Sequence, residues 1–276
     1  MNKKNSLRMK KEYNMTLPIY QVDAFASKLF SGNPAAVVPL EKWLDDSVMQ
    51  SIAAENNLAE TAFFVKEDDH YHIRWMTPTV EVPLCGHATL ASAFVIFNFI
   101  DKEINTVKFQ SKSGELIVSK NGDLLELDFP SNKPHATDKP KDILECFGEE
   151  PIEILSNGFY LFVVFDSENF IRSYIPKIEL IKKIHAHAVI ITARGDNADF
   201  VSRMFAPNSG IDEDPVTGSA HTVLAPYWSE KLGKKNLYAL QVSKRGGELF
   251  CEDSGSRIKI AGQAALYLTG NIYLNL

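Results

Sequence analysis

One short pattern occurs twice in this sequence and places a glycine at the same position each time. Residues Glu81–Ala88 and Glu213–Ala220 both read E-x-P-x-x-G-x-A, with the glycines at Gly86 and Gly218. Each copy leads into an apolar segment, and the first turn of a helix carries unpaired N–H groups and about half a positive charge. Glycine lets an anion approach the backbone closely, so the two copies could hold a carboxylate from both sides. The simpler alternative is that both glycines only allow tight turns.

Polar side chains that could contact a bound anion lie next to both glycines. His87 follows the first glycine, Ser219 follows the second, and three acidic residues in succession (212–214) precede the second. Like charges repel unless a cation lies nearby, and His87 could be that partner. We therefore take Asp214, His87 and Ser219 as candidate site residues. Asp214 could instead be a loop or helix-capping residue, and His87 a structural hydrogen-bonding group.

Glu60 is the candidate for acid–base chemistry. It lies in the segment NNLAETAFF (56–64), where a helical pattern ends and an apolar strand begins. Apolar surroundings raise the pKa of a carboxyl group toward the value that a general base needs. Such a base contributes about 10²–10⁴-fold to a rate. On the local sequence alone, Glu60 reads equally as a solvated residue at the start of a strand.

Cys85 lies immediately before Gly86, where the N-terminus of a helix would lower the pKa of a thiol. A racemase that uses two thiols would need a second cysteine at the equivalent place in the other copy of the pattern. That residue is Thr217. The two-thiol mechanism is therefore disfavoured by the sequence.

The repeated pattern extends beyond these residues and indicates an internal duplication. Arg74–Pro78 aligns with Arg203–Pro207, in the same order relative to the E-x-P-x-x-G-x-A copies. The period is about half the chain, which is too long for a solenoid repeat. Both copies are followed by an apolar helical segment, residues 88–99 and 220–232, and strand-like alternation surrounds each. We expect an α+β fold of two pseudo-symmetric domains, each a mostly antiparallel sheet wrapped around a central helix, with a cleft between them.

Domain boundaries follow from changes in composition. The polar start of the chain (1–15) is expected to be a flexible extension, and residues 16–130 the first domain. The segment 131–150 is rich in proline and charge, so we expect a linker there, with the second domain at 151–276. The last strand that the sequence predicts covers residues 257–261.

Composition excludes several classes of function. The chain has 276 residues, with 29 Lys and Arg against 35 Asp and Glu, and its net charge of −6 comes without a basic run, so we expect no nucleic-acid partner. The most apolar stretch, 89–100, is shorter than the ~20 residues that span a bilayer. The charged N-terminus has no apolar region of a secretion signal after it. Three scattered cysteines without zinc spacing indicate neither a disulfide framework nor a structural metal, so a cytoplasmic location is expected.

Four segments together resemble the phenazine-biosynthesis (PhzF-like) isomerase family, which shares the diaminopimelate epimerase fold. They read FASKLFSGNPAAVVPL, NNLAETAFF, RWMTPTVEVPLCGHATLASA and FAPNSGIDEDPVTGSAHTVLA, and the resemblance covers nearly everything from residue 19 to 268. The family fold is two pseudo-symmetric halves with the site between them. The N-terminal extension lies outside the pattern.

The resemblance implies a role for each candidate residue. The glutamate of the N-x-x-E-T motif, Glu60, would be the catalytic acid/base. His87 and Asp214 would complete the catalytic group, and Ser219 would bind the substrate with the backbone at Gly86 and Gly218. The family chemistry is a proton shift on a cyclic amino acid without a metal or organic cofactor, and the common assembly is a homodimer. We therefore expect an isomerase of a small anionic metabolite; an amino-acid racemase or epimerase and a non-catalytic anion-binding protein remain the alternatives.

Overall fold

A buried apolar helix lies at the centre of each half of the molecule, as the sequence predicts. These helices are α2 (Gly86–Val95) and α6 (His221–Leu232) in the computed structural model, which describes residues 14–275. Both helices are buried on all sides over most of their length, and the hydroxyls of Thr89 and Ser92 in α2 donate to carbonyl oxygens one turn earlier. A helix without a polar face is stable only when other elements cover it completely.

Long strands enclose α2 in the first half. A two-residue strand, β5, lies beside β4, and α1 covers the outer face of the sheet. Successive side chains of a strand point to opposite faces of the sheet, so every second residue of β6 is buried. The bounds are β1 Met15–Ala24, β2 Asn33–Leu40, α1 Asp46–Asn56, β3 Glu60–Glu67, β4 His70–Met76, β5 Glu81–Val82, η1 Ile96–Ile100 (a π-helical turn that continues α2), β6 Thr106–Ser111, β7 Gly114–Asn121 and β8 Leu124–Pro130.

The second half encloses α6 in the same way. Three short helices, α3, α4 and α5, cover the outer face of its sheet over a separate hydrophobic cluster. The bounds are β9 His135–Ala136, α3 Ile143–Phe147, β10 Glu153–Ser156, β11 Tyr160–Val164, α4 Glu168–Ser173, α5 Ile178–Ile181, β12 Ala188–Arg194, β13 Phe200–Ala206, η2 Pro207–Ser209, β14 Ile211–Asp214, β15 Asn236–Gln241, β16 Gly247–Asp253, β17 Arg257–Gly262 and β18 Ala264–Leu274.

Strand pairing repeats between the halves and confirms the expected fold class. From β2 to β8 the successive pairings β2–β3, β3–β4, β4–β6, β6–β7 and β7–β8 are parallel, antiparallel, parallel, antiparallel and antiparallel. The pairings β11–β12, β12–β13, β13–β15, β15–β16 and β16–β17 follow the same order. The two halves are therefore copies of one α+β unit, mostly antiparallel, around a central helix.

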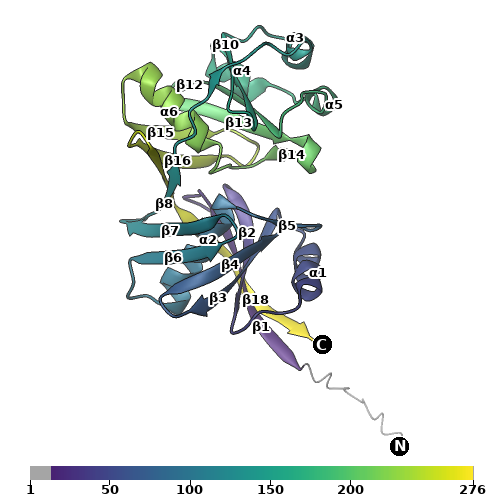
Figure 1. Cartoon of the computed structure of the whole chain (residues 1–276), viewed down its shortest axis with the longest axis vertical. Helices are drawn as coiled ribbons and strands as arrows, with labels where there is room; N and C mark the ends of the chain where they lie inside the picture. Colours follow the sequence, from purple (N-terminus) through teal and green to yellow (C-terminus); the bar gives the residue numbers. More distant parts are fainter. Residues whose placement is uncertain (1–13, 276) are drawn as a thin grey trace, which may run out of the picture.

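The two halves share one sheet and one core. β8 pairs antiparallel with β17, and a single cluster of buried apolar residues includes side chains of both α2 and α6. Figure 1 shows the halves stacked along the long axis of the molecule, with this junction between them. Within the described residues, no helix is long and apolar enough to cross a membrane.

The structure differs from the expected boundaries in three places. β18 pairs along its whole length with β1, so the end of the expected second domain, 151–276, belongs to the sheet of the first. The expected linker, 131–150, contains β9, which pairs with β10, and α3, in which Ile143, Cys146 and Phe147 are buried. Residues 1–13 of the expected extension lie outside the described residues, and Met15 already belongs to β1. Sequence composition misses these features because each depends on pairing between distant segments.

Candidate active site

Glu60 and His87 come together because two elements of the first half begin at the same place. α1 ends at Asn56 and is capped by Asn57, whose φ of 49° lies in the left-handed region, and β3 starts three residues after this cap at Glu60. His87 is the second residue of α2. Both side chains are buried, with Glu60 8% and His87 6% exposed. A short, ordered loop thus presents a carboxylate to the first turn of the central helix.

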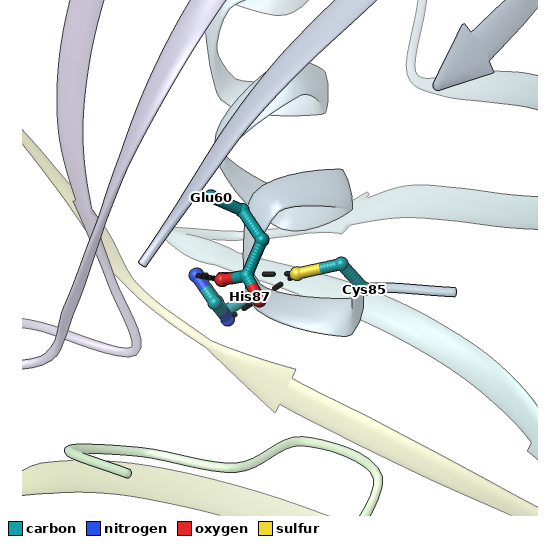
Figure 2. Close-up of side chains that lie close together, drawn as sticks. All are labelled: Glu60, Cys85 and His87. Atoms are coloured by element: carbon teal, nitrogen blue, oxygen red, sulfur yellow. Dashed lines mark hydrogen bonds and ion pairs between the residues drawn. The ribbon is translucent and has the colours of Figure 1, made fainter. Parts of the chain in front are cut away.

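The carboxylate, the imidazole and a thiol form a compact group, shown in Figure 2. Oε2 of Glu60 lies 3.1 Å from Nε2 of His87. Sγ of Cys85 lies 3.5 Å from Nδ1 of the same ring, and the thiol contributes to lowering the pKa of Glu60. The three side chains therefore form one compact group, joined by an ion pair and a thiol–imidazole contact, that has very little contact with water.

The pKa shifts in this group show which charge state the geometry favours. Burial alone would raise the pKa of Glu60, but the charge of His87 and hydrogen bonds from His87 and Cys85 together lower it below its ordinary value. Burial would lower the pKa of His87, yet the neighbouring Cys85 and Glu60 raise it well above 6.5. Burial raises the pKa of Cys85 to about 11, so it remains a thiol. The pair therefore rests as carboxylate and imidazolium.

Asp214 reaches this group through a single side chain, Asn33. The Asn33 amide nitrogen donates to Oδ1 of Asp214 at 2.8 Å and to the Val216 carbonyl at 2.9 Å, and it lies 3.2 Å from Nδ1 of His87. An amide nitrogen has two hydrogens, so the two shorter contacts use both. Asn33 is fully buried at the start of β2. One amide thus connects the first half to the candidate residues of the second.

The surroundings of Asp214 raise its pKa, whereas those of Glu60 lower the pKa of Glu60. Burial raises its pKa to about 6, and the negative charge of Glu60 adds to this increase, although His87, Thr217 and Asn33 oppose it. Oδ2 accepts a hydrogen bond from the Thr217 hydroxyl, and Gln241 holds the loop by accepting from the Thr217 N–H at 2.8 Å. Two carboxyl groups whose pKa values are displaced in opposite directions are the usual arrangement of a base and an acid.

The two glycines of the repeated pattern face each other across the junction. A Cβ placed on Gly86 would lie 4.0 Å from the Cα of Gly218, and one placed on Gly218 would lie 3.4 Å from the ring of Phe25. Gly86 is the first residue of α2, and Gly218 lies three residues before the first residue of α6. Neither has a positive φ, so the turn itself does not require glycine. A Cβ at either position would make only ordinary contacts, so the packing of this structure does not require glycine there either.

Ser219, directly after the second glycine, makes a side-chain hydrogen bond with a residue of the second half. Its Oγ is 3.0 Å from the Tyr160 hydroxyl, and the Tyr160 pKa is raised by burial. The sequence predicts Ser219 as a site residue but does not predict Tyr160, Asn33 or Gln241. Asn33 belongs to the SGNP cluster, which reads as an ordinary turn, and only a long-range contact reveals its position.

Three of these side chains also have the donor types of a transition-metal site. The ligand atoms of Glu60, Cys85 and His87 all lie within 4.8 Å of one another. Oxygen, nitrogen and sulfur donors with an open position suit zinc, although the thiol would have to lose its proton. The expectation of a cofactor-free site is not tested by this geometry and stays a prediction.

The fold defines a class of protein with two epimerase-like halves, and the candidate side chains lie at the junction between them. Comparison places the chain within that class: residues 22–270 match the family described as phenazine biosynthesis-like protein. The chain belongs to this family of PhzF-like isomerases, as the motifs predict.

Relatives support the assignment over their full length. The chain is 50% identical over 260 residues to a Pseudomonas aeruginosa protein described as uncharacterized isomerase PA2770, covering 94% of this chain and 100% of the relative. It is 39% identical to the human phenazine biosynthesis-like domain-containing protein, covering 94% and 99%. A crystal structure of a PhzF-family protein from Enterococcus faecalis superposes with a TM-score of 0.92 at 47% identity, over 94% of this chain and 100% of that one.

More distant structures share the fold alone. A hydroxyproline epimerase from Agrobacterium vitis, crystallised with trans-4-hydroxy-L-proline, has a TM-score of 0.60 at 11% identity, covering 96% of this chain and 94% of that one. The architecture of two halves around central helices is therefore common to PhzF-like proteins and amino-acid epimerases.

Proposed function

We propose that this protein is a cofactor-independent isomerase that moves a proton between two carbons of a small carboxylate-bearing metabolite, with Glu60 as the acid/base. The observation that carries the proposal is the buried contact of 3.1 Å between Glu60 and His87, together with Asp214, which accepts a hydrogen bond from the Asn33 amide that packs against the same imidazole ring. Relatives described as isomerases give the reaction class. The substrate class follows from the resemblance and from the two facing glycines.

The proposed reaction adds no atom to the substrate and removes none. The Glu60 carboxylate takes a proton from a carbon next to an unsaturated or carboxyl group, and the electron pair of that C–H bond moves onto the substrate. The protonated Glu60 then returns the proton to a second carbon on the same face. His87 as an imidazolium holds Glu60 ionised before the transfer. Asp214, whose pKa of about 6 keeps a fraction of it protonated near neutral pH, donates a hydrogen bond in that form to the substrate oxygen where negative charge develops.

Backbone groups would hold the anionic end of the substrate. N–H groups near Gly86 and Gly218 belong to the first turns of two central helices, whose dipoles favour a carboxylate. The helix ends approach closely in this structure, and Glu60 is almost fully buried, so we propose that substrate enters when the two halves move apart. Ser219 and Tyr160 would then contact the polar part of the substrate. We place the enzyme in the cytoplasm, because all three cysteines are free thiols.

Deuterium exchange tests the reaction even while the substrate is unidentified. Protein dialysed against a chelator is incubated in D₂O with fractionated metabolite extracts, and metabolites that gain deuterium on carbon are identified by mass spectrometry. We expect exchange with the wild type, none with Glu60→Gln, and full exchange with Glu67→Gln, an exposed carboxylate on the same strand. Exchange by Glu60→Gln would remove Glu60 from its role, and exchange that requires added zinc would refute cofactor independence.

The same experiment separates the alternatives. A racemase would exchange deuterium while returning the same compound as a mixture of stereoisomers. The two-thiol form of that reaction is disfavoured, because Thr217 occupies the place of the second thiol and donates its hydroxyl to Asp214. A protein that only binds anions would retain a ligand and exchange nothing.

A further inference from the structure

The thiol of Cys85 is the member of the compact group that the proposed reaction does not use. Figure 2 shows the Cys85, Glu60 and His87 side chains pointing toward one another. One ligand atom from each residue, a sulfur, an oxygen and a nitrogen, lies within 4.8 Å of the other two. Among the described residues, no other group of three histidine, cysteine or carboxylate side chains is close enough to share a metal ion. This combination of donors is that of a metal-ligand set.

The spacing of the donor atoms is close to that around a tetrahedral zinc ion. Zinc lies about 2.0–2.2 Å from nitrogen and oxygen ligands and about 2.3 Å from sulfur, so a nitrogen–oxygen pair of ligands is about 3.3 Å apart and a nitrogen–sulfur pair about 3.6 Å. In this structure, Nε2 of His87 lies 3.1 Å from Oε2 of Glu60 and 4.0 Å from Sγ of Cys85. Small side-chain rotations would therefore bring all three atoms to coordination distance.

The backbone holds the three ligands on regular secondary structure. Cys85 is the N-cap residue of α2, and its carbonyl oxygen accepts from the N–H and the hydroxyl of Thr89, at 3.1 Å and 2.6 Å. His87 follows in the first turn of the helix, and Glu60 begins β3, where it is paired with Ala35 of β2. Ligands that project from helices and strands are held more precisely than ligands on loops. A metal ion would therefore bind without first ordering a loop.

One carboxylate oxygen in the group has room for a further bond. Oε2 of Glu60 is buried and receives no hydrogen bond of good geometry within the described part of the chain, although Nε2 of His87 lies 3.1 Å away. Buried polar atoms are normally hydrogen-bonded, so an oxygen in this state is unusual. A metal ion bound to Oε2 would supply the missing partner.

A divalent cation preserves the charge balance of this buried group. At rest the Glu60 carboxylate and the His87 imidazolium cancel each other, and Cys85 is a neutral thiol. Binding of Zn²⁺ forms bonds to the carboxylate, to Sγ and to Nε2, and it releases one proton from the thiol and one from the imidazolium. The loaded group then contains a divalent cation, a carboxylate, a thiolate and a neutral imidazole, so its net charge is again zero. This balance matters because an uncompensated buried charge is strongly destabilising.

We propose that Glu60, Cys85 and His87 bind one zinc ion, and that the zinc-loaded protein is an inactive form of the isomerase. Thiolate and imidazole ligands suit zinc, whereas Mg²⁺ and Ca²⁺ take oxygen ligands and would find one carboxylate here. Bound zinc occupies the carboxylate that takes the proton and the imidazole nitrogen that faces it, so proton transfer stops. The zinc site depends on the geometry alone, and its inactivating effect rests on the proposed function.

Cobalt absorption and zinc competition test the site on the full-length chain after dialysis against a chelator. Co²⁺ takes the place of zinc and gives a thiolate-to-cobalt charge-transfer band only when a cysteine sulfur is a ligand. We expect the wild type to bind one cobalt ion with this band, and zinc to displace it. Cys85→Ala should lose the band and bind zinc at least about 100-fold more weakly, since loss of even an outer partner of a metal ligand costs about 10–100-fold.

The matched control is Cys251→Ala, which removes another buried thiol, on β16 in the second half, and should keep both the band and the zinc affinity. A wild type without the band, or equal zinc affinities of the wild type and Cys85→Ala, would overturn the proposal. Glu60→Gln provides a second test if Cys85→Ala does not fold. Glutamine has the size of glutamate but is a poor zinc ligand, so this variant should keep the band and bind zinc at least about 10-fold more weakly. An unchanged zinc affinity of Glu60→Gln would contradict the three-ligand site.

Deuterium exchange tests the inactivation separately. Saturating zinc should abolish exchange by the wild type, a chelator should restore it, and magnesium should have no effect. Exchange that continues with zinc bound, or that requires zinc, would refute the inactive form. Zinc binding through Cys85 by a protein that exchanges no metabolite even without metal would support the zinc site and count against the proposed reaction.

Discussion

At the scale of single residues, the site depends on an ion pair that is almost fully shielded from water. Glu60 lies 3.1 Å from the His87 ring, and both are buried. Removing one partner of a buried pair leaves an uncompensated charge, which typically costs about 3–5 kcal/mol. The consequence is that the two residues should behave as a unit in stability as well as in catalysis.

A double-mutant cycle measures that coupling. We expect His87→Ala to lower the free energy of unfolding by about 3–5 kcal/mol at pH 7, since it leaves the Glu60 carboxylate buried and unpaired. In the Glu60→Gln background the same change should cost less, with a coupling energy of about 1–3 kcal/mol. Urea unfolding of the four proteins gives the value. Additive effects would mean that the two side chains do not interact in solution.

Asp214 gives a prediction for pH. Its folded-state pKa of about 6 lies above the ordinary 3.8, so the folded protein binds this proton more tightly than the unfolded chain. Stability from this group is therefore fully present below pH 4 and is lost as the pH rises through about 6. From pH 4 to pH 7 the wild type should lose up to about 3 kcal/mol relative to Asp214→Asn.

Unfolding in urea at several pH values tests this prediction. Asp212→Asn, an exposed aspartate two residues away, controls for the change in net charge. A difference between wild type and Asp214→Asn that stays constant from pH 4 to pH 7 would contradict the shifted pKa.

Sequence identified the charged members of the site but not the residue that connects them. Glu60, His87 and Asp214 lie in motifs with a resemblance to a family, and the structure brings all three into one network. Asn33 makes the connection, yet its neighbours Ser31, Gly32 and Pro34 give it the appearance of a turn residue. Its role depends on contacts with residues 54, 181 and 183 positions away in the chain, which no local pattern can reveal.

At the scale of elements, the proposed function assigns the anionic end of the substrate to the starts of the two central helices. A Cβ placed on Gly86 would meet the Phe129 ring at 3.7 Å, an ordinary contact distance, so alanine fits there without strain. We expect Gly86→Ala to change the midpoint of thermal unfolding only slightly and to abolish binding of small carboxylates, because the methyl group fills the space between the two helix starts. Calorimetry with the exchange-active metabolite, or thermal shift with simple carboxylates, measures both effects.

Gly247 at the start of β16 is the contrasting position. A Cβ there would lie 2.4 Å from a methyl group of Val216 and 3.0 Å from the Phe25 carbonyl oxygen, so Gly247→Ala should cost about 1–3 kcal/mol. If Gly86→Ala proved the more destabilising of the two, or still bound carboxylates as the wild type does, the helix starts would not be the anion site.

The sequence predicts the elements that have a local sequence pattern and does not predict the others. The E-x-P-x-x-G-x-A copies and the apolar segments after them predict two halves with central helices, and the structure has both. The sequence does not predict β18, because AALYLTGN lacks a clean alternation and its pairing partner, β1, lies about 250 residues earlier in the chain. Likewise α4 and α5, between β11 and β12, are too short for a helical pattern to stand out.

At the scale of the whole molecule, the two halves are structurally distinct but not independent. β18 closes the sheet of the first half with residues from the end of the chain, β8 pairs with β17, and Asn33 of the first half donates to Asp214 of the second. One hydrophobic cluster also runs through both halves. Separation of the halves would expose apolar side chains from α2 and α6 together, so neither half should be stable once the other unfolds.

Unfolding of Trp228→Phe tests this cooperativity within a single variant. Its remaining tryptophans, Trp43 and Trp75, lie in the first half, so fluorescence reports that half while far-ultraviolet circular dichroism reports the whole chain. We expect the two signals to give the same midpoint in urea, because the shared sheet and core make unfolding a single transition. A fluorescence midpoint that differs from the circular dichroism midpoint would mean that the halves unfold separately. In that case the motion needed to admit a substrate would require no loss of shared core, and the duplication would have kept two independent units.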